Sequence, residues 1–298
     1  MSPNPMKPSG KSRSKINVAE PRLQAPQTPE SLRIIRGRAK VYAEYSAGLL
    51  TAVMASLVAA KNQLRSAMKD RLTGIAHDSI KAQSQAVFET LKTFRPYVEA
   101  QKVSIFLSMP SGEIQTDGIV RHALLAGKHV YIPYLHKSPF APGETPPRVM
   151  DMVRLRDLHD YESLQLDKWG IPSIDPKTVN QRDRVLGEPG AESSELSFLD
   201  LMLLPGVAFD IDSNSGSLRR LGHGKGFYDL FIRRYATKYN ELSSPKHPVL
   251  LYGLALSEQF LSQPSDGPVP VAQHDQQLHG LILGNGEVKR PADSSRSK

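Results

Sequence analysis

A run of ten residues, Arg220–Asp229 (RLGHGKGFYD), constrains the fold of this chain more than any other segment. It lies between an almost fully apolar stretch, Leu199–Pro205, and a helical pattern that starts at Tyr228. Glycine reaches backbone dihedral angles closed to other residues and lets the backbone approach a ligand closely. Free N–H groups at the start of a helix, with a lysine beside them, bind anions. The run therefore predicts a phosphate-binding loop between a strand and a helix.

The spacing of the glycines excludes two familiar phosphate-binding loops. It matches neither the P-loop, GxxxxGK[ST], nor the dinucleotide-binding fingerprint, GxGxxG. Alternating glycines alone are equally compatible with a plain surface turn. Arg220, Lys225 and Asp229 favour the binding loop, because a plain turn needs no charges at a strand-to-helix junction.

The net charge of +8 resides in the ends of the chain. Residues 1–40 carry nine Lys or Arg and two Glu (+7), and residues 286–298 carry four basic and two acidic residues (+2), which leaves −1 for the rest. A near-neutral body argues against a nucleic-acid partner. The absence of cysteine excludes disulfides, thiolate catalysis and cysteine-based zinc sites. We expect a cytoplasmic protein, with mitochondrial targeting through the Arg-rich segment 33–40 as the alternative.

The composition divides the chain into three parts. Residues 1–54 are expected to be a disordered basic extension, residues 55–285 an α/β domain, and residues 286–298 a disordered tail. The longest apolar run, Ala47–Ala60, is too short and too often interrupted by Ser and Thr to span a bilayer, so we expect no membrane partner. We expect the protein to be a monomer. Met54 is an alternative position for the start of translation.

Apolar strands alternate with helices through the central part of the chain. This order predicts an α/β fold with three α/β/α layers and a mainly parallel, Rossmann-like sheet. In such sheets, ligands bind beyond the carboxyl ends of the strands, which here would be the loops Pro110–Gln115 and Gly206–Gly226. The predicted strands are Lys102–Met109, His129–Pro133, Val149–Leu155, Leu199–Pro205 and Val249–Leu256; the predicted helices include Asp78–Phe94, Thr116–Ala126 and Asp229–Tyr239.

The segments LPGVAFD (Leu204–Asp210) and RLGHGKGFYD resemble the 5-formyltetrahydrofolate cyclo-ligase family, also called 5,10-methenyltetrahydrofolate synthetase. The resemblance extends from about Lys61 to Leu283 because further motifs follow in the family's order. These are KNQLR (Lys61–Arg65), IFLSM (Ile105–Met109) followed by Glu113, MDMV (Met150–Val153), WGIP (Trp169–Pro172) and PVAQHD (Pro270–Asp275).

The resemblance implies an ATP- and Mg²⁺-dependent reaction. 5-Formyltetrahydrofolate becomes 5,10-methenyltetrahydrofolate, with release of ADP and phosphate. ATP phosphorylates the formyl oxygen, a neighbouring folate nitrogen attacks the activated carbon, and phosphate departs. Such phosphoryl transfer relies mostly on positioning and charge neutralisation. A polyglutamate tail on the folate is compatible with the basic residues near the site, and a preference for it stays open.

The resemblance also assigns roles to residues, with Lys225 and Arg220 as the catalytic pair and Asp229 and Asp275 as Mg²⁺ ligands. The implied ATP-binding residues are Lys61, Asn62, Gln63, Leu64, Arg65, Arg220, Leu221, Gly222, His223, Gly224, Lys225, Gly226, Phe227 and Tyr228. The implied substrate-binding residues are Arg65, Leu107, Glu113, Trp169, His223, Gly224, Lys225, Gly226 and Phe227.

Each assignment has a plainer alternative. The basic residues would suit a solvated loop or an ordinary basic helix face, and the acidic ones a turn or a first helical turn. Trp169 would equally suit a core. His223 and Phe227 depart from the family, in which many members carry Arg and Tyr at these positions. Competing functions are a non-catalytic relative that binds nucleic acid or protein, and a sugar-phosphate isomerase or acyl-transfer enzyme on a similar scaffold.

Overall fold

The computed structural model describes residues 29–139, 146–187, 197–241, 248–263, 266–273 and 275–292. The chain divides into two units, Met1–Met54 and Ala55–Lys298. Helix α1, Pro29–Thr73, includes residues of both units. Residues 29–54 are thus helical rather than disordered as predicted, since Ala, Leu and Arg recur there and favour a helix. Residues 1–28 lie outside the described residues.

The segment Glu44–Thr73 of α1 is long and apolar enough to cross a membrane by length and composition alone. The sequence expectation differed because it considered only the run Ala47–Ala60, whereas the helix continues past both ends of that run. Within the larger unit, Met68 of this helix is buried in a cluster with Val207 and Ala208. The last turns of α1 therefore belong to the packing of the α/β domain.

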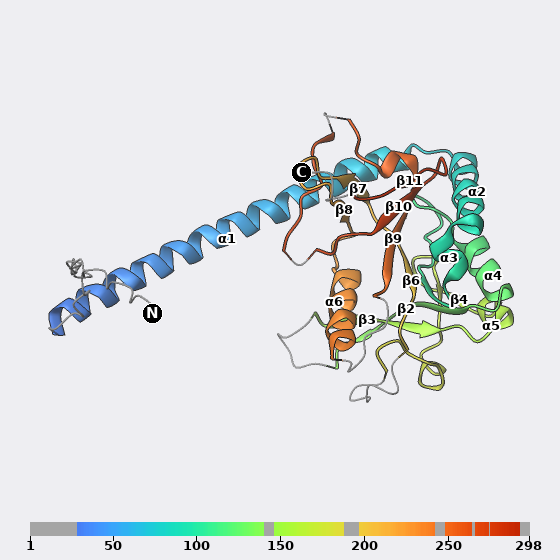
Figure 1. The fold of residues 1–298 in the computed structure, drawn as a ribbon, viewed down its shortest axis with the longest axis horizontal. Helices are drawn as coiled ribbons and strands as arrows, with labels where there is room; N and C mark the ends of the chain where they lie inside the picture. Colours follow the sequence, from blue (N-terminus) through green and yellow to red (C-terminus); the bar gives the residue numbers. More distant parts are fainter. Residues whose placement is uncertain are drawn as a thin grey trace, which may run out of the picture. The chain divides into compact units, whose positions relative to one another are not determined.

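A seven-stranded sheet forms the centre of the larger unit, in the order β11-β10-β9-β6-β1-β2-β3 (Figure 1). The five inner strands run parallel, and β3 and β11 join the two edges antiparallel. The α/β class with a mainly parallel sheet is confirmed. The strands are β1 Lys102–Ile105, β2 His129–Lys137, β3 Arg148–Arg154, β6 Leu201–Leu204, β9 Leu250–Ala255, β10 Gly280–Leu283 and β11 Val288–Lys289.

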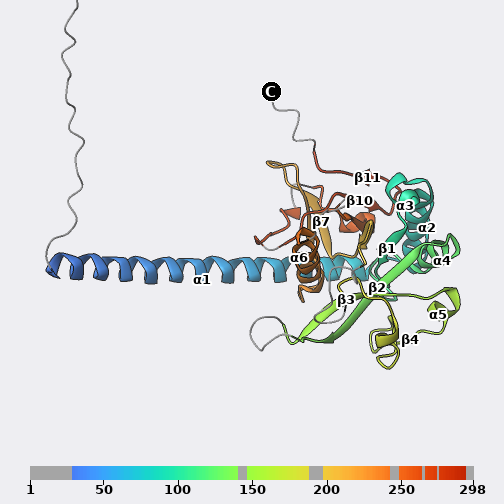
Figure 2. The same cartoon turned by 60° about the horizontal axis from the view of Figure 1, so that its bottom comes forward.

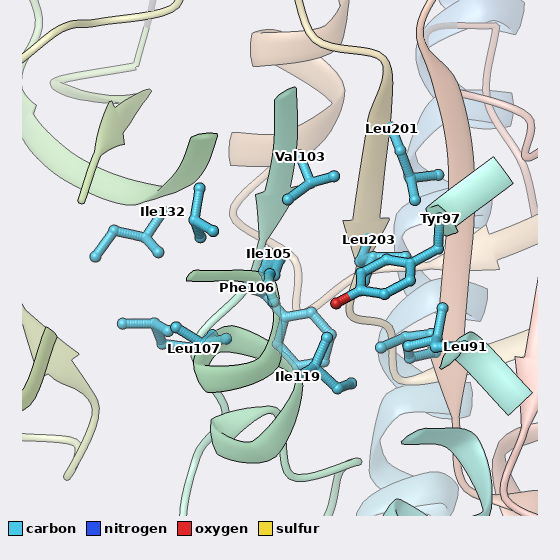
Figure 3. Packing of buried hydrophobic residues seen from close by; sticks show 14 of the residues in the cluster. Leu91, Tyr97, Val103, Ile105, Phe106, Leu107, Ile119, Ile132, Leu201 and Leu203 are labelled. Carbon is cyan, nitrogen blue, oxygen red and sulfur yellow. The ribbon is translucent and has the colours of Figure 1, made fainter. Parts of the chain in front are cut away.

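Both faces of the sheet are covered by helices. Leu201 and Leu203 of β6 enter one core, with α2, α3 and α4 (Figure 3), whereas Met202 and Leu204 enter a second core, with α6. Side chains of a strand alternate between faces, so a strand buried on both sides is apolar throughout. The helices are α2 His77–Thr93, α3 Arg95–Glu99, α4 Asp117–Leu125, α5 Leu158–Glu162 and α6 Phe227–Asn240, with short 3-10 turns at Val179–Gln181 and Ser257–Gln259.

The chain leaves the two central strands in opposite directions. From β1 it passes through α4 to β2, and from β6 through α6 to β9, on the other face. The carboxyl ends of β1 and β6 are adjacent, since Ile105 lies beside Leu203. Such a reversal opens a crevice in which ligands bind. The loops after these two strands are therefore the place to look for a site.

Four segments differ from the sequence expectations. Strand β10, Gly280–Leu283, was not among the predicted strands. The predicted loop Gly206–Gly226 contains an antiparallel hairpin of β7, Ala208–Ile211, and β8, Leu218–Leu221. Its strands have four residues each, too few for a clear alternating pattern. A second hairpin, β4 Gln165–Leu166 and β5 Pro172–Ser173, follows α5 (Figure 2). The predicted tail 286–298 contains β11, which is ordered because it pairs with β10, and residues 293–298 lie outside the described residues.

Candidate functional site

The glycine loop connects β8 to the 14-residue helix α6. Gly224 and Gly226 have positive φ angles of 92° and 66°, which side chains disfavour, and Gly226 is the N-cap of α6. A Cβ on Gly224 would lie 3.1 Å from Cζ of Arg65. The loop therefore needs glycine for its conformation and for a close neighbour. Its backbone ends at a helix N-terminus, which carries partial positive charge.

Helix α1 brings two basic side chains to this loop. Nε of Arg65 donates to the carbonyl of Gly222 at 2.9 Å, and its Nη1 donates to Oδ1 of Asn62 at 2.8 Å. Burial lowers the pKa of Arg65, an effect partly offset by Asp275. Met68, one turn after Arg65 and seven residues after Lys61, is buried on the same helix face and orients them both.

The two predicted metal ligands lie close together. The backbone N–H of Gln276 donates to Oδ1 of Asp229 at 3.2 Å, which places the segment after Asp275 against the first turn of α6. Nζ of Lys61 lies 2.5 Å from Oδ2 of Asp275. Nη2 of Arg220 lies 2.9 Å from Oδ1 of Asp229. Each carboxylate therefore has a cationic partner from a different part of the chain.

The two predicted catalytic residues have different surroundings. Arg220 is buried, its Nη1 donates to the carbonyl of Pro205 at 3.2 Å, and its Nε has no hydrogen-bond partner within the described part of the chain. Its guanidinium lies 5.7 Å from the ring centre of Tyr228. Lys225 is exposed and makes no ion pair with any residue that the structure describes. Arg220 thus holds Asp229 in place, whereas the Lys225 ammonium can meet an incoming anion.

The donor set fits a magnesium ion that arrives with phosphates. Mg²⁺ prefers oxygen ligands and is commonly held by one or two carboxylates together with phosphates and water. Asp229 and Asp275 supply two carboxylates beside the glycine loop. Among the described residues, no group of three or more His, Asp or Glu could form a metal cage of its own. The arrangement suits a metal–nucleotide complex better than a permanent protein-bound metal.

Glu113 lies in the loop after β1, with 4% of the residue exposed. The backbone N–H of Met109 donates to its Oε1 at 2.5 Å. Burial raises the pKa of Glu113 to about 7. The pKa of Tyr228 is also raised, first by burial and then by the nearby charge of Glu113. The carboxyl therefore lies near Tyr228, the second residue of α6.

The remaining predicted residues divide between exposed and buried positions. Leu64 and Leu221 pack in the cluster around Met68, so their side chains stabilise the fold. Leu107 is buried in the core that contains α2, α3 and α4. Phe227, the first residue of α6, is partly buried against the second core, whereas Gln63 is exposed.

The two exposed positions that remain are His223, in the glycine loop, and Trp169, at the tip of the β4–β5 hairpin. Desolvation and then the charges of Arg220 and Arg65 lower the pKa of His223, which favours the uncharged ring. At this position a phosphate would meet a hydrogen-bonding ring rather than a positive charge.

Sequence reasoning missed two buried polar residues that fix the site's backbone. Nε2 of Gln259 donates to the carbonyl of Gly206 at 2.7 Å. Asp210 accepts the backbone N–H of Val269 at 2.9 Å and pairs with Arg219, and so anchors the segment that leads to Asp275. Asp210 is the last residue of the LPGVAFD motif, so its place in that motif could have identified it. No motif in the sequence around Gln259 pointed to the role of Gln259.

The chain is similar to proteins of one known family. Residues 58–283 match the model of the 5-formyltetrahydrofolate cyclo-ligase family. A probable 5-formyltetrahydrofolate cyclo-ligase of Caenorhabditis elegans is 36% identical over 77% of this chain and 95% of its own length. The Mus musculus 5-formyltetrahydrofolate cyclo-ligase is 31% identical over 75% of this chain and 93% of its length. A mitochondrial 5-formyltetrahydrofolate cyclo-ligase of Arabidopsis thaliana is 26% identical over 78% of this chain and 77% of its own length.

The fold is also similar to a solved structure. The NMR structure of 5,10-methenyltetrahydrofolate synthetase from Aquifex aeolicus covers 80% of this chain and 96% of its own, with a TM-score of 0.51 and 21% sequence identity. At that identity the likeness concerns the fold alone. It is consistent with the central sheet and its flanking helices.

Proposed function

Because the chain belongs to the 5-formyltetrahydrofolate cyclo-ligase family and is an enzyme, we propose that it converts 5-formyltetrahydrofolate to 5,10-methenyltetrahydrofolate at the expense of ATP. ADP and phosphate would be the other products. We further propose that Mg²⁺ accompanies ATP, that the protein acts as a monomer, and that it works in the cytoplasm.

One observation carries this proposal: the groups needed for phosphoryl transfer meet at one edge of the sheet. The glycine loop and Lys225 lie at the start of α6, next to the Lys61–Asp275 pair, and Glu113 lies on the other side, near Tyr228. Oriented N–H groups and positive charges stabilise a transferring phosphoryl group. A buried carboxyl with paired acceptor oxygens suits the N–H and amino donors of a pterin ring.

The reaction can be written with these residues in place. The formyl oxygen attacks the γ-phosphorus of ATP, the bond to ADP breaks, and an O-phosphorylated formyl group forms. The second folate nitrogen attacks the formyl carbon, loses its proton to solvent, and expels phosphate, which leaves the methenyl bridge. Lys225 and the N–H groups of residues 222–226 would hold the phosphates, while Glu113 would orient the pterin. When bound, Mg²⁺ would neutralise phosphate charge, with Asp229 and Asp275 as its protein ligands.

A turnover assay tests this function directly. Purified protein is mixed with 5-formyltetrahydrofolate, with and without Mg-ATP, and the methenyl product is followed by its near-ultraviolet absorbance. We expect product only with Mg-ATP. Lys225→Ala should lower kcat/KM by about 100-fold or more, because it removes a charge at the transferring group. The matched control is Lys238→Ala, which removes an exposed lysine from the last turn of α6, the helix that follows the loop.

Two outcomes would contradict the proposal. Protein that binds the folate but never turns it over would support the non-catalytic alternative. Equal kinetics in Lys225→Ala and Lys238→Ala would remove Lys225 from the phosphate site and leave the reaction itself intact.

A further inference from the structure

The only tryptophan of the chain, Trp169, is 65% exposed at the tip of the β4–β5 hairpin. Nζ of Lys168 lies 5.2 Å from the centre of its ring, and an exposed aromatic ring offers a face on which a planar ligand can stack. The tip contacts the loop that carries Glu113, because a Cβ on the adjacent Gly170 would lie 2.9 Å from Cγ of Pro110. The tip that carries Trp169 is therefore held beside the loop Pro110–Gln115.

The backbone of the tip is itself well defined. Oδ1 of Asp167 accepts the N–H groups of Trp169 and Ile171 at 2.7 and 3.0 Å, and Gly170 adopts a positive φ of 75°. The backbone N–H of Asp167 also donates to the carbonyl of Ile171 at 2.8 Å. The strands of the hairpin are held by core packing of Leu164, Ile171 and Ile174 and by contacts of the segments that flank them.

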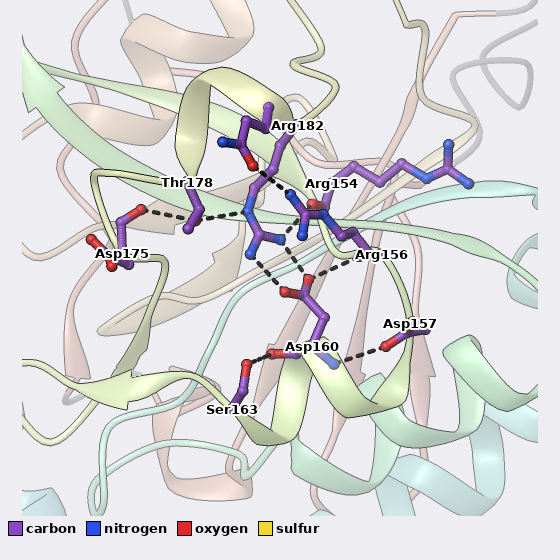
Figure 4. A network of polar contacts seen from close by, with 9 residues as sticks. Arg154, Arg156, Asp157, Asp160, Ser163, Asp175, Thr178 and Arg182 are labelled. Carbon is purple, nitrogen blue, oxygen red and sulfur yellow. Dashed lines mark hydrogen bonds and ion pairs between the residues drawn. The ribbon is translucent and has the colours of Figure 1, made fainter.

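A buried ion pair joins the two segments that flank the hairpin, since Asp160 belongs to α5 and Arg182 follows the 3-10 turn Val179–Gln181 (Figure 4). Nη1 and Nη2 of Arg182 donate to the two carboxylate oxygens of Asp160 at 2.5 and 2.6 Å, across 22 positions of sequence, with only 4% and 11% of these side chains exposed. Nη1 of Arg182 also donates to the carbonyl of Arg154, at the end of β3, and the N–H of Arg156 donates to Asp160. A bidentate arginine–carboxylate interaction fixes both the orientation of the two side chains and the distance between them.

The hairpin and the Asp160–Arg182 pair therefore form one strap, residues 160–182, tied to the end of β3. We propose that Asp160 and Arg182 are positioning residues that hold Trp169 against the ring system of the folate substrate. Neither residue touches the substrate; both act through the direction of the hairpin. This inference rests on the proposed function, because it takes the folate as the ligand that Trp169 stacks on.

The single tryptophan makes the strap directly observable. Trp169 fluorescence is titrated with 5-formyltetrahydrofolate in wild type, Arg182→Gln and Arg182→Lys, and KM and kcat are measured in parallel. In both variants we expect Kd and KM to rise about tenfold, with kcat within about threefold, and lower fluorescence anisotropy without ligand. Tenfold corresponds to about 1.4 kcal/mol, the scale of one aromatic stacking contact.

Two variants are needed because breaking a buried pair is strongly destabilising. Arg182→Lys keeps the positive charge but cannot form the bidentate interaction. It therefore replaces Arg182→Gln in the test if Arg182→Gln does not fold. The matched control is Arg154→Gln, which removes a neighbouring but more exposed ion pair with Asp183 and should leave Kd and anisotropy unchanged.

The outcomes separate this inference from the function beneath it. The inference would be overturned if a folded Arg182 variant had unchanged Kd and anisotropy, or if Arg154→Gln had an equal effect. It would also be overturned if the wild type were active but its fluorescence did not change when the substrate is added. A wild type that forms no product and shows no fluorescence change would instead overturn the proposed function.

Discussion

Replacing Glu113 with glutamine should make the protein more stable and less active. The carboxyl is buried, and its pKa is raised from 4.5 to about 7 by desolvation. That shift corresponds to about 3 kcal/mol, at 1.36 kcal/mol per pKa unit, against the ionised form in the folded state. Glutamine keeps a carbonyl oxygen for the N–H of Met109 and carries no charge.

The pH dependence follows from the raised pKa. Below pH 4.5 the carboxyl is neutral in both the folded and the unfolded chain, and the full stability of the neutral form is present. As the pH rises to 7 the unfolded chain ionises first, so wild-type stability falls, and above pH 7 the loss is complete. Glu113→Gln should therefore gain up to about 3 kcal/mol at pH 8, with the gain shrinking towards zero near pH 4.5.

Urea unfolding of both proteins at pH 5, 6, 7 and 8 measures this difference. The same variant should lose about 100-fold in kcat/KM, because hydrogen bonds to a charged partner contribute about 1.5–3 kcal/mol each. A stability gain of equal size at pH 5 and pH 8, or no gain at pH 8, would refute the buried, perturbed carboxyl. The matched control is Glu162→Gln, which neutralises an exposed glutamate paired with Arg121.

Three further predictions concern helix α1 and the glycine loop. Gly224→Ala should raise the KM for ATP about tenfold through backbone strain and contact with Arg65, measured in the turnover assay; an unchanged KM would count against the loop's role. Lys61→Met should bind Mn²⁺ several-fold more tightly without nucleotide, because the ammonium no longer pairs with Asp275, as electron paramagnetic resonance can measure; equal or weaker binding would contradict it. Met68→Ala should lose about 2–5 kcal/mol in urea unfolding, as a buried methionine does, and a loss below 1 kcal/mol would mean that α1 is dispensable for the domain.

The strands and helices that flank the site were predictable because each has one strong pattern. The run Leu199–Pro205 could only be a strand buried on both faces, and the structure has β6 there. The helices α2, α4 and α6 lie within two residues of their predicted bounds. The hairpins β4–β5 and β7–β8 were missed because two or four residues do not display a period, and only their partners make them strands.

The residues of the candidate site were singled out from the sequence, but the contacts between them were not. Gly222–Gly226, Lys61, Arg65 and Asp275 were each singled out from the sequence, and the structure brings them together. That Arg220 is buried against Asp229, rather than open to phosphate, depends on the hairpin that sequence reasoning missed. Gln259 escaped notice because burial of a polar side chain is set by tertiary packing.

The ion pair between Lys61 and Asp275 joins positions 214 residues apart. On a ribosome that adds roughly 5–20 residues per second, these two side chains emerge about 10 to 40 s apart. The sheet strands β1, β2, β3, β6 and β9 are all made in that interval. The Lys61–Asp275 pair is thus completed only after most of the sheet has been made. A nascent chain that ends before residue 275 carries Lys61 and Arg65 without the carboxylate that lies beside them in the folded protein.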